Sequence, residues 1–327
     1  MTRSNDLLHE ALQRRATRRR VLRGGLGLAG AGMLAAGFGV FGQTPGIARA
    51  QYNTYGWPTS VPTLSMGFIP LEDAVQQRSR LKVFSDFISE RIGVGNEVAI
   101  TTSYAALVEA QRNKQTVTGY YGALSFLLAE QQFGAVPIMV DSADGVTPGS
   151  YNSLLLAGKD SPVQSVQDVR GQDFSFVDPA STSGNLFPRV MLIEEGMDPN
   201  RDVRGRYAGN HQNSILAIAN GQVPCGASNN ISVDSAIRNG VIAPDALRIL
   251  KISDPIPNGP FAVHPDLDPQ AVSLLQSAMG QFLDRDILKG MELQGPLIPV
   301  ETSAYNFVRR AATAINLQFD EKGKAIF

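Results

Sequence analysis

The chain of 327 residues has few of the residues on which several common kinds of site depend. It contains one cysteine, Cys225, and three histidines. A single thiol excludes an internal disulfide, and the sequence has neither an H-E-x-x-H motif nor a Cys/His cluster that would hold a metal. It also lacks the G-x-S-x-G turn of a serine hydrolase. We therefore predict that the protein is not an enzyme and has no metal site, no catalytic residues and no cofactor.

The chain also lacks an excess of positive charge. It has 29 basic and 30 acidic residues, and eight of the basic but only two of the acidic ones precede residue 51. Residues 51–327 therefore hold 21 basic and 28 acidic residues, a net charge of −7. This balance argues against nucleic acid as a partner. An anionic ligand would have to be attracted by local hydrogen-bond donors rather than by the charge of the whole protein.

The first 50 residues have the pattern of an export signal. The basic run Thr17-Arg18-Arg19-Arg20-Val21-Leu22-Arg23 precedes a glycine-rich apolar stretch, and Ala48-Arg49-Ala50 has the spacing of a cleavage site. The apolar stretch is shorter than the roughly 20 residues that a membrane-spanning helix needs. We predict a twin-arginine signal peptide over residues 1–50, cleavage near Gln51, and a periplasmic protein.

The rest of the chain alternates short apolar runs with amphipathic stretches. Residues 63–69 alternate as a strand does, residues 72–92 have a helical apolar stripe, and strand and helix patterns continue in turn to residue 140. This order predicts an α/β fold with a mostly parallel sheet and helices on both faces. Residues 145–150 have turn composition, a second α/β unit follows, and residues 254–260 form a stiff proline-rich segment. Two long helices, at about 269–284 and 303–318, are expected to return to the first lobe.

The segment Asp178-Pro179-Ala180-Ser181-Thr182-Ser183-Gly184 is the strongest candidate for a binding site. It precedes a helical run, and Pro188 places the helix start near Ser183 or Gly184, because proline is tolerated only in the first turn. The backbone N–H groups of residues 183–187 would then have no helical partner and would suit a small oxyanion. Alternatively, Ser183 only caps a surface helix.

The order and spacing of six short motifs resemble those of the phosphonate, phosphite and phosphate-binding proteins of ABC importers. These proteins are a branch of the type II periplasmic binding proteins. The motifs are Ser103-Tyr104-Ala105-Ala106, Tyr120-Tyr121-Gly122, Asp178 to Gly184, Gly209-Asn210-His211, Ala219-Asn220-Gly221-Gln222-Val223 and Ile256-Pro257-Asn258.

The resemblance implies two α/β lobes joined by two hinge crossings, with the ligand cleft between them. We place the first part of lobe 1 at residues 51–152, lobe 2 at 153–258, and the return of lobe 1 at 259–327. It also implies a monomer that captures phosphite, phosphate or an alkylphosphonate by lobe closure and delivers it to an ABC permease.

By the same resemblance, the hydroxyl groups of Ser181, Thr182 and Ser183 would hold the oxyanion. His211, Tyr104 and Tyr121 would close over it, since imidazole and phenol groups are suitable neutral donors. Alone, His211 could equally be a turn or helix-capping residue, and the two tyrosines could be half-buried packing residues.

Two positions depart from relatives that take aminoalkyl phosphonates. Those relatives have carboxylates at the positions that align with Ser232 and Gly259, where they would meet the ligand's ammonium group. Because an ammonium group without a counter-charge is strongly disfavoured in a buried site, we predict poor binding of aminoethylphosphonate.

Cys225 raises an alternative function. Some members of the broad family are periplasmic sensors of oxyanions such as arsenite, which thiols bind, and partner a membrane histidine kinase. The competing interpretation is that Cys225, which precedes the small residues Gly226 and Ala227, is a buried packing residue.

Overall fold

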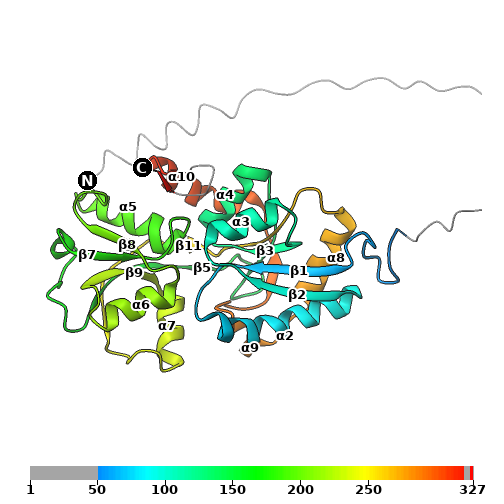
Figure 1. Cartoon of the computed structure of the whole chain (residues 1–327), viewed down its shortest axis with the longest axis horizontal. Coiled ribbons are helices and arrows are strands. Elements are labelled where there is room, and N and C mark those ends of the chain that lie inside the picture. Colours follow the sequence, from blue (N-terminus) through cyan, green and yellow to red (C-terminus); the bar gives the residue numbers. More distant parts are fainter. Residues whose placement is uncertain (1–50, 320–324, 327) are drawn as a thin grey trace, which may run out of the picture. The chain divides into compact units, whose positions relative to one another are not determined.

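The computed structural model describes residues 51–319 and 325–326. The predicted signal peptide lies outside these residues. Most of the described chain forms two lobes, each built on one β-sheet with helices on both faces (Figure 1). None of the helices in this part of the chain is both long and apolar enough to span a bilayer.

The first lobe contains a six-stranded sheet of order β13-β4-β12-β3-β1-β2. Strands β2, β1 and β3 run parallel, whereas β12 is antiparallel to β3 and β4, and β13 is antiparallel to β4. The strands are β1 (Thr63–Phe68), β2 (Gly95–Ile100), β3 (Thr118–Tyr120), β4 (Val136–Asp141), β12 (Phe261–Val263) and β13 (Leu297–Pro299).

Helices cover both faces of this sheet, and each face has its own apolar core. One core includes Phe84, Phe261 and Leu275, beneath α2 (Ala74–Ile92), α8 (Pro269–Gly280) and α9 (Arg285–Gly290). The other includes Phe126 and Tyr305, beneath α3 (Tyr104–Arg112), α4 (Ala123–Phe133) and α10 (Asn306–Ala314). Burial on two faces stabilises the sheet by roughly 25 cal/mol for each Å² of apolar surface removed from water.

The second lobe contains a five-stranded sheet of order β10-β6-β9-β7-β8. Its strands are β6 (Ser153–Gly158), β7 (Asp173–Phe176), β8 (Arg204–Tyr207), β9 (Cys225–Asn229) and β10 (Leu247–Ile252). One core lies against α5 (Phe187–Glu194), and the other lies against α6 (His211–Ala219) and α7 (Asn230–Arg238).

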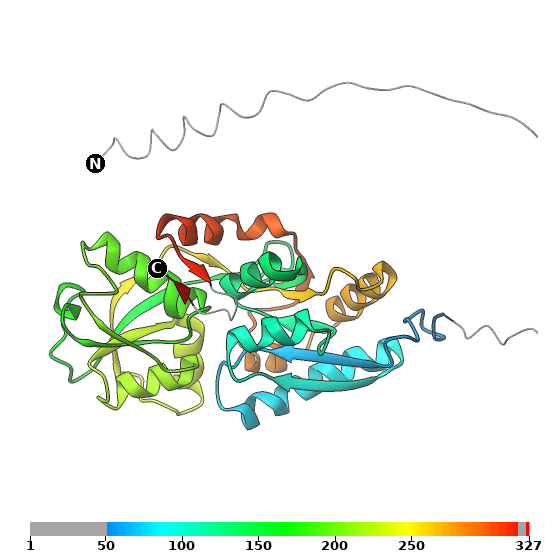
Figure 2. The same cartoon turned by 45° about the horizontal axis from the view of Figure 1, so that its top comes forward.

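The chain crosses between the two sheets twice, and the crossings pair with each other. On the way out it forms β5 (Ser150–Tyr151), and on the way back it forms β11 (Ile256–Pro257), which is antiparallel to β5. The C-terminal helix α10 packs against both α4 and the turn that precedes α5, so it contacts both lobes near the crossings (Figure 2). A last short pair, β14 (Gln318–Phe319) and β15 (Ala325–Ile326), follows α10.

Side-chain caps determine where the helices that matter for the site begin. The Ser103 side chain accepts a hydrogen bond from the Ala106 N–H at 3.1 Å, and Asn210 accepts one from the Asn213 N–H at 2.7 Å. Such caps satisfy N–H groups that the helix itself leaves free. As a consequence, Tyr104 and His211 are the first residues of α3 and α6.

The structure corrects three details of the predicted fold. Both sheets are mixed rather than mostly parallel, because the first strand to enter each sheet after a crossing, β6 in the second lobe and β12 in the first, runs opposite to both of its neighbours. The helix expected at 269–284 ends at Gly280, and the helix expected at 303–318 is confined to Asn306–Ala314 after a short turn. Strand β13 was not predicted, because its three residues are too few for a periodic pattern.

Candidate ligand-binding site

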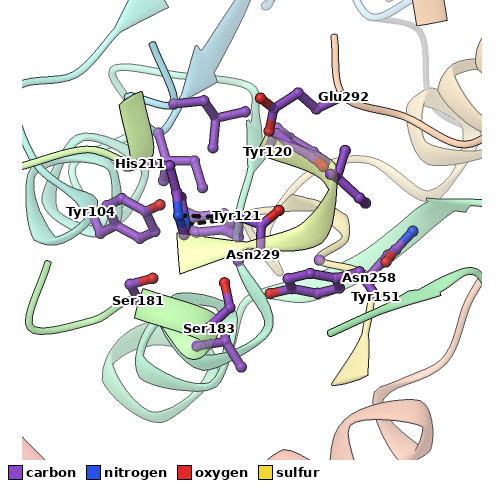
Figure 3. Close-up of a pocket in the computed structure, with 16 residues that line it drawn as sticks. Tyr104, Tyr120, Tyr121, Tyr151, Ser181, Ser183, His211, Asn229, Asn258 and Glu292 are labelled. Carbon is purple, nitrogen blue, oxygen red and sulfur yellow. Dashed lines mark hydrogen bonds between the residues drawn. The ribbon is translucent and has the colours of Figure 1, made fainter. Parts of the chain in front are cut away.

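A small polar pocket lies between the two sheets and brings all six predicted site residues together (Figure 3). Its volume is about 50 Å³, which corresponds to roughly three to five water molecules and is the scale of one small tetrahedral ion. Among the described residues that line it, none is lysine or arginine. They are Ile69, Leu71, Tyr104, Tyr120, Tyr121, Gly122, Tyr151, Ser181, Thr182, Ser183, His211, Asn229, Ile231, Asn258, Gly259 and Glu292.

The serine-rich segment forms one wide helical turn, Thr182–Leu186, directly before α5. The Ser181 side chain caps this turn by accepting a hydrogen bond from the Gly184 N–H at 3.0 Å, and the Ser183 carbonyl accepts one from the Ser153 hydroxyl at 2.7 Å. Gly184 has no room for a side chain, since a Cβ there would lie 2.3 Å from Val177. The cap, the bond from Ser153 and the close contact with Val177 therefore fix the position of the turn, and its hydroxyl groups line the pocket.

The helix begins earlier than the sequence analysis placed it, and this changes which amides are free. The prediction named residues 183–187, but the Gly184 N–H donates to Ser181 Oγ, the Leu186 N–H to the Ser181 carbonyl, and the Phe187 N–H to the Thr182 carbonyl. Within the described chain, the N–H groups of Thr182 and Ser183 have no hydrogen-bond partner. The free donors are thus at the very start of the turn, as expected for the first N–H groups of a helix.

Hydrogen bonds across the cleft hold the two lobes together beside this turn. Thr182 Oγ1 accepts one from the Leu124 N–H, near the start of α4, at 2.8 Å. The Asp178 carboxyl accepts one from the Tyr104 N–H at 3.3 Å and another from the Ala180 N–H at 2.8 Å. Burial raises the pKa of Asp178, while the two N–H donors oppose that rise. Asp178 therefore shapes the turn and contacts the opposite lobe.

His211 is buried, and its ring faces the pocket from the five-stranded lobe. Its Nδ1 lies 2.9 Å from Ser228 Oγ, and the Asn229 side-chain nitrogen lies 3.3 Å from the ring. Burial lowers the pKa of His211 to about 3, so the imidazole is neutral near pH 7. When the Ser228 hydroxyl donates to Nδ1, Nε2 carries the proton and acts as a neutral donor.

Three tyrosine side chains, from Tyr104, Tyr120 and Tyr151, surround the pocket with their hydroxyl groups. Burial raises the pKa of all three, so each keeps its proton and remains a possible donor. The neighbouring Ser181 side chain opposes the rise in the pKa of Tyr104, and the Ser183 and Thr182 side chains oppose it for Tyr151. The phenols and the serine side chains therefore line the pocket with neutral polar groups.

Tyr121 differs from the role predicted for it. Its hydroxyl donates to Gln111 Oε1 at 2.8 Å, inside the six-stranded lobe, so its only donor is used there. Tyr121 still lines the pocket, but its neighbour Tyr120 and the crossing residue Tyr151 have the phenols that face the cavity. Tyr120 lies in one of the six motifs but was given no role, and Tyr151 was not predicted to line the site.

Comparison with known proteins identifies the family. A family model described as "ABC transporter, phosphonate, periplasmic substrate-binding protein" matches residues 66–305. The chain belongs to this family. Its members are substrate-binding components of transporters and not enzymes.

The chain is also similar in sequence to individual phosphate-import and phosphonate-binding proteins. The Phosphate-import protein PhnD of Mycolicibacterium smegmatis is 27% identical over 229 residues, which cover 67% of this chain and 71% of the relative. The Phosphonates-binding periplasmic protein of Escherichia coli is 29% identical over 206 residues, which cover 61% of this chain and 60% of the relative.

A solved structure supports the fold. The structure of PhnD1 from Prochlorococcus marinus in complex with methylphosphonate superimposes with a TM-score of 0.71 at 20% identity. It covers 78% of this chain and 98% of that one. The predicted type II periplasmic binding protein fold is confirmed.

Glu292 is the main feature of the pocket that the sequence analysis missed. It follows α9 in the returning part of the first lobe, and its Oε2 accepts a hydrogen bond from the Ser232 hydroxyl at 2.8 Å. Burial raises the pKa of Glu292 to about 7, although Ser232 and Arg238 oppose the rise. The carboxyl group is thus divided between its neutral and ionised forms near neutral pH.

Glu292 overturns the premise of one prediction. We expected no carboxyl group near Ser232 and Gly259, yet Glu292 is hydrogen-bonded to Ser232 and lines the same pocket. Gly259 itself has no space for a carboxylate, because a Cβ there would lie 1.8 Å from the Tyr121 carbonyl oxygen. The acidic group therefore comes from a position 60 residues away from Ser232 in the chain, which matching of motifs could not reveal.

Cys225 lies away from the pocket, in the core of the five-stranded lobe. It is fully buried beside Phe174 and Ala227, and its thiol contacts the Asp173 carbonyl at 3.6 Å. Burial, with a smaller contribution from Asp173, raises its pKa to about 12, so the reactive thiolate is suppressed. The packing interpretation is the one that the structure supports. No group of three or more acidic, cysteine or histidine side chains in the described residues could hold a metal ion.

Proposed function

We propose that the protein captures one small tetrahedral oxyanion, namely phosphite, phosphate or an alkylphosphonate, between its lobes. The observation that carries this proposal is the concentration of neutral donors around a cavity of one ion's size. They are the free N–H groups of Thr182 and Ser183, the serine hydroxyls, neutral His211 and the phenols. Donors fixed in a site of low dielectric stabilise an anion without a formal positive charge.

Closure of the lobes is the proposed means of capture. We place the hinge at the paired crossings β5 and β11, with residues 51–152 and 259–327 on one side and residues 153–258 on the other. The cross-lobe hydrogen bonds of Thr182, Asp178 and Ser232 support this mechanism, because a ligand that contacts both lobes favours the closed arrangement.

Titration calorimetry of the purified exported protein tests this proposal. Phosphite, phosphate and methylphosphonate would each be titrated, with acetate as an anion of the wrong geometry. We expect saturable binding of one ion per chain for at least one of the three and none for acetate. The absence of binding for all three phosphorus anions would contradict the proposal.

The reason for expecting poor binding of aminoethylphosphonate no longer holds. Glu292 places an acidic group where the ligand's ammonium end could meet it. We propose that aminoethylphosphonate binds and that Glu292→Gln weakens it more than it weakens methylphosphonate. Equal effects on both ligands would show that Glu292 does not contact the ammonium group.

The family indicates a transporter as the partner, and the specific partner is part of the proposal. We propose that the closed form docks on an ABC permease as a monomer. The sensor alternative, in which a histidine kinase is the partner, depended on a thiol that could reach arsenite, and Cys225 is buried away from the pocket.

Export by the twin-arginine pathway remains a proposal about residues 1–50. Replacement of Arg18 and Arg19 by lysine keeps the charge of the leader but removes the arginine pair. We expect the variant to accumulate unprocessed inside the cell. Unchanged export of the variant would contradict the assignment.

A further inference from the structure

A second and much larger cavity opens beside the ligand pocket. Its volume is about 500 Å³, and it shares Ile231 and Glu292 with the smaller pocket. It lies between α7 of the five-stranded lobe and α9 of the six-stranded lobe, so both lobes form its walls. The two cavities are therefore neighbours that meet at these two side chains.

The larger cavity is lined by basic side chains that are not neutralised. Arg238 projects from α7, and Arg285 and Lys289 project from α9. All three are exposed, and none forms a hydrogen bond or an ion pair with another residue in the part of the chain that the structure describes. Against them stand Asp234 and the partly neutral Glu292, so the cavity has an excess of positive charge within a protein of negative net charge.

The sizes of the two cavities constrain what a longer ligand would do. The smaller pocket has space for the tetrahedral head group alone, so a substituent of more than a few atoms must leave it. Where the substituent passes Ile231 and Glu292, it enters the basic cavity. A distal carboxylate or phosphate would find three cationic side chains there, from both lobes, without displacing any existing partner.

We propose that the larger cavity binds the tail of an extended ligand, a phosphonate or phosphate ester that has a second anionic group at its far end. This inference rests on the proposed function, because it requires the head group to occupy the smaller pocket. Single exposed ion pairs contribute little, but an anion that bridges cations on two lobes also favours closure. The tail should therefore strengthen binding by about tenfold rather than by orders of magnitude.

Three ligands of equal head group and similar length test the inference: 3-phosphonopropionate, propylphosphonate and 3-aminopropylphosphonate. We expect the carboxylate-tailed ligand to bind about tenfold more tightly than propylphosphonate at low salt, with the difference shrinking as salt is added. Equal binding of these two ligands would overturn the inference. So would tighter binding of the amine-tailed ligand than of 3-phosphonopropionate by the Glu292→Gln protein, in which the ammonium end has no carboxylate to meet.

Two variants and a control test whether the cations of α9 cause the tighter binding of the anionic tail. Arg285→Gln and Lys289→Gln should each remove most of the advantage of 3-phosphonopropionate, whereas methylphosphonate, which has no tail, should bind as before. Arg206→Gln, at an exposed arginine of β8 that lines neither cavity, should change nothing. Equal weakening of methylphosphonate by the α9 variants would mean that these cations act on the head group rather than on the tail, and would overturn the tail site.

The outcomes separate this inference from the function on which it rests. If methylphosphonate binds but the tail confers no advantage, the inference fails and the proposed function stands. If no phosphonate binds at all, the proposed function fails and the inference fails with it.

Discussion

The two neighbouring cavities differ in their chemistry, although we propose that both bind anionic groups. The small pocket is formed by buried hydroxyl, amide and imidazole groups without a formal positive charge, whereas the larger cavity is lined by exposed arginine and lysine. Neutral donors at fixed positions recognise geometry, because each hydrogen bond requires a correctly placed oxygen. Exposed cations attract any anion but are screened by salt. In the proposed account, selectivity for the head group and attraction for the remainder of a ligand are therefore separate properties.

The largest expected effect is on the neutral pocket. Ser183→Ala removes one hydroxyl but leaves the hydrogen bond from the Ser153 hydroxyl to the Ser183 carbonyl in place. Because a hydrogen bond to a charged group contributes about 1.5–3 kcal/mol, methylphosphonate binding should weaken by roughly 10- to 150-fold. Calorimetry would measure this change.

Ser277→Ala, in α8 and outside both cavities, is the matched control and should bind normally. A similar affinity for Ser183→Ala and the control would show that the serine turn does not contact the ligand.

A smaller effect is expected from Glu292, at the boundary between the cavities. Its pKa in the folded protein is about 7, above its ordinary value of 4.5, and a bound anion favours the protonated form. Affinity for methylphosphonate should therefore fall several-fold as the pH rises through 7, relative to Glu292→Gln. Comparison of the two proteins with one ligand cancels the ionisation of the ligand itself.

The raised pKa of Glu292 also predicts that the stability of the protein depends on pH. Since folding raises the pKa of Glu292, the native state binds more protons than the unfolded state between about pH 4.5 and pH 7. The wild-type protein should lose stability relative to Glu292→Gln as the pH rises across this range, and the difference should be constant above it. Parallel melting temperatures of the two proteins from pH 5 to pH 8 would contradict this assignment.

The smallest effect on binding is expected from Cys225. Its replacement by serine places a hydroxyl in an apolar core, which should cost about 1–3 kcal/mol of stability. The affinity for methylphosphonate should not change, because Cys225 does not line either cavity. Tight binding of arsenite that depends on Cys225 would revive the sensor alternative.

Features that are encoded within a short segment of the chain could be predicted from the sequence. The serine turn and His211 lie in short motifs, and the caps that position α3 and α6 are encoded within three residues of each helix start. The predicted set of free amides was partly wrong, because Gly184, Leu186 and Phe187 use theirs in hydrogen bonds and the free Thr182 amide was not named. Pro188 limits where a helix begins but does not fix it. Fold class was predictable from the alternation of strands and helices.

Features that depend on distant parts of the chain could not be predicted. Glu292 follows a short helix, has a left-handed backbone with φ of 62°, and reaches the pocket only because the chain returns to the first lobe. The direction of the Tyr121 hydroxyl depends on Gln111, and the basic cavity depends on α7 and α9 facing each other. No pattern within a single segment contains this information.

A crystal structure of the protein with methylphosphonate tests the central claim most directly. We predict the phosphonate oxygens within hydrogen-bonding distance of the Thr182 and Ser183 N–H groups, the serine hydroxyls and His211. The methyl group should be directed toward Ile231 and the larger cavity. A phosphonate bound among Arg238, Arg285 and Lys289, with the small pocket empty, would contradict the account.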